Sequence, residues 1–227
     1  MRPELMAVLV LALSACPAKM EVPAPVGGGT GVTGGGAGGG GGAVEGDAGL
    51  AKSAKARVRF KGNERFAIDL AVGLGLPIDQ LCKELGQYDC AFFVHGVALG
   101  GVEPYGVGLY EPPQQTGATT ALAVERVVLS ACARRLAADV ANPSTALIYR
   151  GIPVVDGKLS PVDGPEVRAL IADLAQRAWL RDPTADEVES LLALARDIEP
   201  SHPTDAAQQW ALAACFTVFS SAEAVFY

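Results

Sequence analysis

The chain has 227 residues, of which half are apolar and 19% are charged, and its formal net charge is −7. This composition is typical of a globular protein, and the acidic charge argues against nucleic acid or an anionic lipid surface as partner, because both are bound through clusters of Lys and Arg. Beyond the N-terminus no apolar run approaches the roughly 20 residues that span a bilayer, so we do not expect a membrane-embedded protein.

Residues 1–15 have the organisation of an export signal. Arg2 supplies a positive charge, residues 5–13 are almost wholly apolar, and Ser14 and Ala15 are small residues that precede Cys16. An apolar segment of this length suits a signal peptide and is too short for a membrane span.

The run Leu13-Ser14-Ala15-Cys16 resembles the lipobox of type II signal peptides, which export bacterial lipoproteins. The resemblance implies cleavage before Cys16, a diacylglycerol on its sulfur and an acylated N-terminus, so that the protein binds the membrane through a lipid anchor. Pro17 stands where aspartate in that family favours the inner membrane, which points to the outer membrane of the cell envelope. The alternative is an ordinary secretory signal followed by an incidental cysteine.

Residues 16–53 are expected to form a lipidated cysteine and a flexible linker. Glycine dominates residues 27–49, and Gly38–Gly42 is an unbroken glycine run. Such a segment cannot bury enough apolar area to offset its ordering entropy, and as a coil of roughly 30 residues it has an average span of about 30 Å. A phosphate-binding loop is not indicated, because the flanking strand, helix and lysine are missing from the pattern.

Residues 54–227 are expected to form a single domain, all-α, with about six helices. Apolar residues at spacings of three and four, together with capping residues, predict the helices. In the first half the predicted pieces are Asn63–Val72, a short helix Pro77–Leu85 and a piece Cys90–Leu99 capped by Asp89. In the second half they are a helix from Ala121 to about Val140 capped by Thr120, then Glu166–Leu180, a helix opened by a capping box at Thr184 and Glu187, Ala206–Phe219, and a final turn Ala222–Tyr227 after a box at Ser220 and Glu223. Only Ala146–Val155 has β character.

Four cysteines remain once Cys16 is assigned to the lipid, and an even number in an exported protein predicts disulfides. Three pairings are possible, and we favour Cys82–Cys90 across a short turn at Gly86 with Cys132–Cys215 between two apolar helix faces. The alternative is buried free thiols. The chain has no C-x-x-C spacing, so we expect no zinc, no haem and no other cofactor.

Two features are candidates for function. His95 is the basis of one hypothesis, a small-molecule-processing envelope enzyme in which it acts with Asp89 or Glu103. The other hypothesis, which we favour, is a non-enzymatic interaction or structural module that binds an envelope protein, because a lipid anchor and a long tether precede a domain without catalytic signatures. The Gly- and Tyr-rich loop around Glu103, Tyr105 and Tyr110 is the candidate surface, because tyrosines offer amphipathic contact area. The alternative for this loop is a structural connection packed on the helices.

The stretch 171–227 is similar to a helix pair of uncharacterised exported bacterial proteins. The shared features are Arg181-Asp182-Pro183-Thr184 with Glu187, a helix that carries a Trp near its start, then Ser220-Ser221 with Glu223, and terminal aromatics. Ala224 stands where that pattern often has phenylalanine. The matching residues are mostly caps and core, so the resemblance implies a helical fold and no activity.

Overall fold

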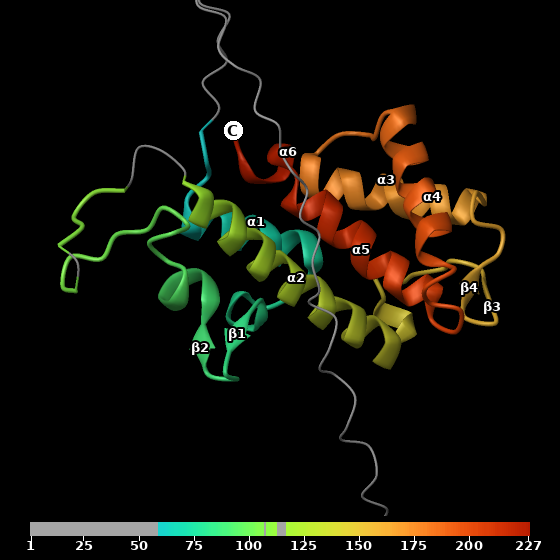
Figure 1. The fold of residues 1–227 in the computed structure, drawn as a ribbon, viewed down its shortest axis with the longest axis horizontal. Helices are drawn as coiled ribbons and strands as arrows, with labels where there is room; N and C mark the ends of the chain where they lie inside the picture. The colour runs from blue at the N-terminus through green and yellow to red at the C-terminus, as the bar shows by residue number, and fades with distance from the viewer. Residues whose placement is uncertain (1–58, 107, 113–116) are drawn as a thin grey trace, which may run out of the picture. The chain divides into compact units, whose positions relative to one another are not determined.

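The computed structural model describes residues 59–106, 108–112 and 117–227. The signal peptide, Cys16 and the glycine-rich linker predicted above lie outside the described residues. In the part that is described, six α-helices form the fold, which confirms the mainly helical class. They are α1 (Asn63–Leu74), α2 (Ala118–Ala141), α3 (Pro165–Trp179), α4 (Ala185–Ile198), α5 (Ala206–Ser220) and α6 (Ala222–Val225) (Figure 1).

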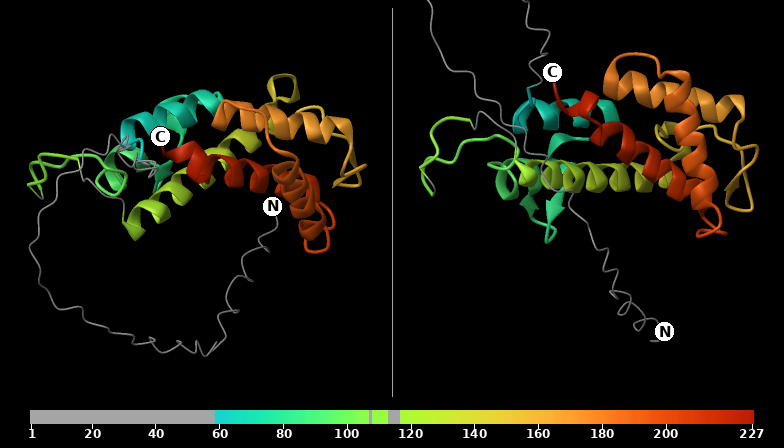
Figure 2. Two further views of the ribbon diagram at one scale, coloured as in Figure 1. Left: turned by 90° about the horizontal axis from the view of Figure 1, so that it is seen from above. Right: turned by 45° about the horizontal axis from the view of Figure 1, so that its top comes forward.

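Helix α5 is the centre of the fold, because it contacts α2, α3, α4 and α6 (Figures 1 and 2). It carries no charged residue, and a helix that is apolar on nearly all sides is stable only when other elements cover it. Its Trp210 is fully buried and donates its indole N–H to the carbonyl oxygen of Leu191 at 2.9 Å, so the one polar atom of that side chain is satisfied.

Local capping signals place several helix ends. Helix α4 begins at the predicted capping box, in which Thr184 accepts from the Glu187 amide and Glu187 accepts from the Thr184 amide. Helix α2 instead begins at Ala118, three residues before its predicted start. Thr120, the predicted cap, lies inside the first turn and donates to the carbonyl oxygen of Ala98 at 2.8 Å. The last short helix is capped by Ser221, which accepts from the Ala224 amide, where Ser220 was predicted.

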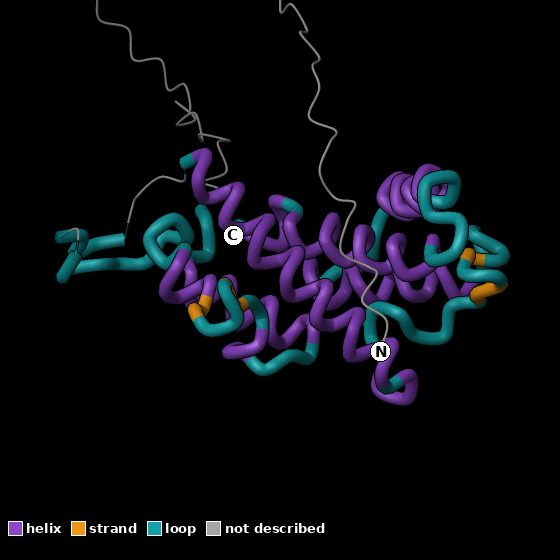
Figure 3. Tube along the Cα trace, turned by 60° about the horizontal axis from the view of Figure 1, so that its bottom comes forward, coloured by secondary structure: helices purple, strands orange, loops and turns teal. Residues whose placement is uncertain are grey.

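Two small antiparallel hairpins accompany the helices, on opposite sides of the described domain (Figure 3). One joins β1 (Lys83–Glu84) to β2 (Tyr88–Asp89), and the other joins β3 (Val154–Val155) to β4 (Lys158–Leu159). The predicted helix Pro77–Leu85 is therefore wrong: only Ile78–Gln80 is helical, as a short 3-10 turn, and the chain then enters β1.

Both predicted disulfides are present. Cys82 pairs with Cys90 at a Cα–Cα distance of 5.4 Å, and Cys132 pairs with Cys215 at 5.9 Å, so that the second bridge links α2 to α5. Two disulfides indicate an oxidising compartment outside the cytoplasm. Among the described residues we find no helix with the length and apolar character that crossing a bilayer requires.

The two ends of the described chain meet in a short antiparallel bridge. Phe60 lies opposite Phe226, the amide of Tyr227 donates to the carbonyl oxygen of Arg59 at 2.8 Å, and the two phenylalanine rings pack edge to face. The bridge holds residues 225–227 beside the start of α1, and two cavities of the domain lie next to it.

Candidate interaction surface

Residues 78–97, which contain the Cys82–Cys90 disulfide, carry many exposed apolar side chains. We call these residues the stapled segment. The hairpin β1–β2 leads into a π-helical turn, Cys90–Val94, and the Cys82–Cys90 bond joins the two ends of the hairpin. The amide of Cys90 donates to the carbonyl oxygen of Cys82, and Asp89 caps the π-helical turn by accepting from the Phe92 amide at 2.8 Å. The segment is thus held by covalent and hydrogen bonds at its base.

Seven large apolar side chains within these twenty residues are more than a third exposed. They are Ile78, Leu85, Tyr88, Phe92, Phe93, Val94 and Val97. The rings of Tyr88 and Phe93 stack at a centroid distance of 5.7 Å, which joins the hairpin to the π-helical turn. Single exposed apolar residues are normal on a protein surface, whereas several within one short segment make that segment a candidate interaction surface.

Leu85 is unfavourable in two ways at the tip of the hairpin. Its φ of 51° and the φ of 75° at Gly86 give the turn two left-handed residues, and the left-handed conformation costs a residue with a Cβ about 1–2 kcal/mol. Its side chain is also 89% exposed. Asn or Asp at this position would relieve both costs. Leucine at position 85 is therefore unfavourable both for the backbone conformation of the turn and for the exposure of its side chain to water.

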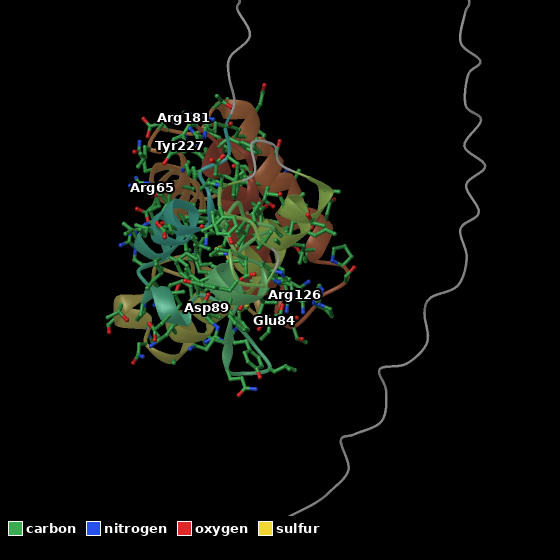
Figure 4. The ribbon with its side chains drawn as sticks, turned by 90° about the vertical axis from the view of Figure 1, so that its left-hand side faces the viewer. Arg65, Glu84, Asp89, Arg126, Arg181 and Tyr227 are labelled. Atoms are coloured by element: carbon green, nitrogen blue, oxygen red, sulfur yellow. A yellow bond between two sulfur atoms is a disulfide. The ribbon has the colours of Figure 1, made fainter. Side chains whose placement is uncertain are left out.

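A polar network fixes the stapled segment to α2. One carboxylate oxygen of Glu84 accepts from Arg126 Nε at 2.7 Å and from His95 Nε2 at 3.0 Å. Figure 4 shows Glu84 and Arg126 next to each other. The three residues come from β1, α2 and the end of the π-helical turn, so a single carboxylate connects all three elements. The network therefore connects the base of the stapled segment to α2.

This network also places His95. Sequence reasoning paired His95 with Asp89 or Glu103, whereas the structure pairs it with Glu84 and uses Asp89 as a cap. His95 lines neither of the two cavities described for this domain. In the described ranges we find no group of three or more His, Cys, Asp or Glu side chains that could hold a metal. The enzyme hypothesis stays a prediction, and no geometry at His95 adds to it.

The loop that follows the stapled segment extends away from the helices (Figure 2). Glu103 and Leu109 exchange two backbone hydrogen bonds of 2.9 Å, and the carboxylate of Glu103 accepts from the Gly106 amide, so the loop is a narrow ribbon. Tyr105 is 98% exposed and Tyr110 is 77% exposed. These two tyrosines do not pack on the helices.

The exposed apolar side chains of the stapled segment are what sequence reasoning missed. Leu85 and Phe93 were predicted to lie in helices, where such side chains would be buried on the inner face. The usable signal was the equal spacing of Cys82 and Cys90 on either side of Gly86, which fits a closed hairpin better than two helices, because a short loop centred on Gly86 places the two cysteines opposite each other.

No protein-family model, no curated protein and no solved structure matches this chain.

Proposed function

We propose that the protein is a lipid-anchored lipoprotein of the cell envelope, held at the outer membrane through Cys16, whose domain is a non-enzymatic interaction module. The stapled segment and the adjoining Tyr105–Tyr110 loop form its binding surface for an envelope protein. The observation that carries the proposal is Leu85, an exposed leucine in a left-handed turn that a covalent bond holds in place. The lipobox resemblance supports the anchor, and the two disulfides support the compartment.

Rigidity is what makes such a surface useful. Ordering a flexible loop on binding costs free energy, and a surface that is already ordered avoids that cost. The Cys82–Cys90 bond, the Asp89 cap and the Glu84 network each restrict the stapled segment before any partner arrives. Aromatic side chains with few rotatable bonds, such as Tyr88 and Phe93, are enriched at the centres of protein interfaces for the same reason.

The negative charge around the surface indicates which kind of partner it can bind. Residues 78–111 contain five carboxylates and one lysine. An anionic membrane is attracted by clusters of Lys and Arg, so it is disfavoured as the target. The surface fits a protein face that is apolar at its centre and basic at its rim, because such a face complements both the aromatic side chains and the acidic surroundings.

Site-specific photo-crosslinking in the full-length, membrane-bound protein tests this assignment. A photoreactive residue replaces Phe93 in the stapled segment, and a second variant carries it at Val155, which is 56% exposed in the other hairpin. We expect a discrete protein adduct from position 93 and none of the same mass from position 155. Adducts to lipid alone at position 93 would refute a protein partner.

Leu85→Asn separates binding from folding. The change creates an Asn-Gly turn, which favours the observed left-handed residues, so we expect the hairpin to be as stable as before or more stable. The crosslink from position 93 should nevertheless be lost. Asp156→Asn is the matched control, because it creates the same dipeptide in the β3–β4 hairpin, where Asp156 and Gly157 also have positive φ. A full-strength crosslink in the Leu85→Asn protein would show that the tip does not bind the partner.

A further inference from the structure

A groove of about 480 Å³ lies between α1, the end of α3 and the α6 region, on a part of the domain that the proposed function does not use. Its volume is in the range of pockets that hold small molecules. Its floor is formed by buried apolar side chains, Phe66, Leu70, Phe219 and Ala224. The floor is therefore suited to a hydrocarbon chain.

The apolar character continues to the rim. Ile68, Val72 and Leu180 line the groove and are 45%, 74% and 84% exposed. Leu180 ends α3 in the left-handed conformation, with a φ of 59°, where glycine is the usual residue. Like the hairpin tip, this position combines backbone strain with an exposed apolar side chain, and such positions cluster at ligand sites.

One end of the groove carries an excess of positive charge. Lys61 and Arg65 both bind Asp69, at 3.0 and 2.9 Å, so two cations share one carboxylate. The Lys61 side chain is only 11% exposed, and its ammonium lies 5.7 Å from the centre of the Tyr227 ring. A charge that is withdrawn from water acts in a lower dielectric and attracts an anion more strongly.

At the other side of the groove the charge is negative, because Arg181 binds both Glu223 and Glu187. Glu223 is held by Arg181, with contacts of 2.5 and 2.6 Å from its two oxygens, and Arg177 is paired with Asp173. Figure 4 shows Arg65, Tyr227 and Arg181 on the same side of the domain. In a chain of net charge −7, the Lys61–Arg65 end is thus a local cationic site beside an apolar floor.

We propose that this groove binds a single-chain anionic amphiphile, with its alkyl chain on the Phe66–Phe219 floor and its anionic head at Lys61 and Arg65. The shared chemistry is an acyl chain with one negative head, and its source is either a free long-chain carboxylate or an anionic lysophospholipid. The proposal is independent of the stapled segment, which lies elsewhere in the fold.

Trp179 supplies a direct readout, because it lines the groove whereas the other of the two tryptophans, Trp210, is buried in the core. We expect a brominated long-chain carboxylate, added to the full-length protein below its micelle concentration, to quench tryptophan emission saturably. Trp179→Phe should abolish the saturable part. A brominated lysophosphatidylglycerol is the second arm, and the arm that binds more tightly identifies the source.

The charge assignment is tested with Arg65→Gln. Arg65 is largely exposed, so the variant folds, and we expect it to weaken carboxylate binding about two- to fivefold while leaving a brominated alcohol of equal length unaffected. Arg134→Gln on α2 is the matched control and should bind as the parent does. Leu85→Asn should also bind normally, which keeps this result separate from the partner assignment. Absence of saturable quenching in both arms, or equal binding of acid and alcohol that Arg65→Gln does not change, overturns the proposal.

Discussion

The carboxylate of Asp139 shows how one buried charge can position a whole loop. Its Oδ2 accepts from three consecutive amides, those of residues 147–149, at 2.7 to 3.0 Å. Its Oδ1 accepts from Arg135, one turn earlier on α2, at 2.6 Å. Because every lone pair has a donor, the charge is tolerated at 1% exposure, and the chain after α2 is tied back to that helix.

We predict that Asp139→Asn is strongly destabilising. The amide keeps the size of the carboxylate, but it turns an N–H group toward the Arg135 guanidinium and leaves that nearly buried charge without its partner. Removing one member of a buried pair costs about 3–5 kcal/mol, so the free energy of unfolding in urea should fall by that amount. Asp163→Asn, at an exposed position, is the control. Equal stability of the two variants would contradict the role of the network.

Arg181 joins residues of three helices near the C-terminal end of the domain. Its guanidinium donates to Glu187 at 2.7 and 2.9 Å, to Glu223 at 2.5 and 2.6 Å, and lies over the ring of Trp179. Hydrogen bonds from Arg181 and from the Thr184 amide lower the pKa of Glu187 to about 2, and the two carboxylates raise the pKa of Arg181. The Thr184–Glu187 cap is therefore also part of an ion-pair network that links the end of α3 to α4 and α6.

Acid should remove this contribution selectively. Because the folded pKa of Glu187 lies below its unfolded value of 4.5, its stabilisation is present above that value and is lost as the pH falls toward about 2. At neutral pH we expect Glu187→Gln to lower the free energy of unfolding by up to about 1 kcal/mol, since the network is partly exposed. Urea titrations should show this difference vanish in the acid range. In an Arg181→Gln background the difference should be small at every pH; an undiminished difference there would exclude Arg181 as the cause.

At the scale of single residues, contacts between near neighbours in the sequence could be predicted, whereas contacts between distant residues could not. The Thr184–Glu187 box is a four-residue signal and was predicted correctly. The Asp139 contacts reach eight to ten residues ahead, into a segment with no regular pattern, so no local rule could place them. His95 found Glu84 rather than the nearer Asp89 for the same reason: the hairpin, once formed, brings β1 beside the π-helical turn.

Among the secondary-structure elements, periodicity worked where helices are long and failed at the hairpins. On α2 the predicted row of residues spaced by four begins buried at Val124 and ends with Val140 at 46% exposure. Each step of four residues advances about 40° around an α-helix, so the row turns away from the core and Asp139 takes the inner position. The β3–β4 hairpin had a readable signal, Asp156-Gly157 between apolar residues, which is typical of a two-residue turn.

The two disulfides should contribute unequally. They close loops with sequence separations of 83 and 8 residues, for which chain entropy gives about 4–5 and about 2–3 kcal/mol. We expect the Cys132→Ala/Cys215→Ala double variant to lose the larger amount, because its bridge spans the α2–α5 core. Cys82→Ala/Cys90→Ala should lose less and should mainly increase hydrogen exchange within the stapled segment. Chemical denaturation of both variants tests the order, and a larger loss from the short loop would contradict it.

For the whole molecule, the fold class followed from composition and helix pattern, whereas the positions of its surfaces did not. The groove combines residues from α1, α3, α5, α6 and both ends of the described chain, and its first and last lining residues, Lys61 and Tyr227, are 166 positions apart in sequence. The partner surface depends on a hairpin that local patterns assigned to a helix. These two apolar features also affect how membrane association is measured. Either the exposed segment or the groove can bind detergent, so the protein can enter the detergent phase without a lipid anchor.

The anchor is therefore tested by two readouts together. Three acyl chains on Cys16 would hold the protein at the membrane, since each buried methylene contributes about 0.8 kcal/mol and a single chain binds only marginally. We predict that Cys16→Ser blocks both cleavage by the lipoprotein peptidase and incorporation of labelled palmitate, and that it moves the protein out of the detergent phase. Ser14→Ala is the matched control, because it keeps a small residue before the cysteine, and it should be cleaved and labelled as the parent is. Label that persists in Cys16→Ser would exclude Cys16 as the lipidation site, and detergent partitioning that persists without label would assign the membrane association to the domain itself.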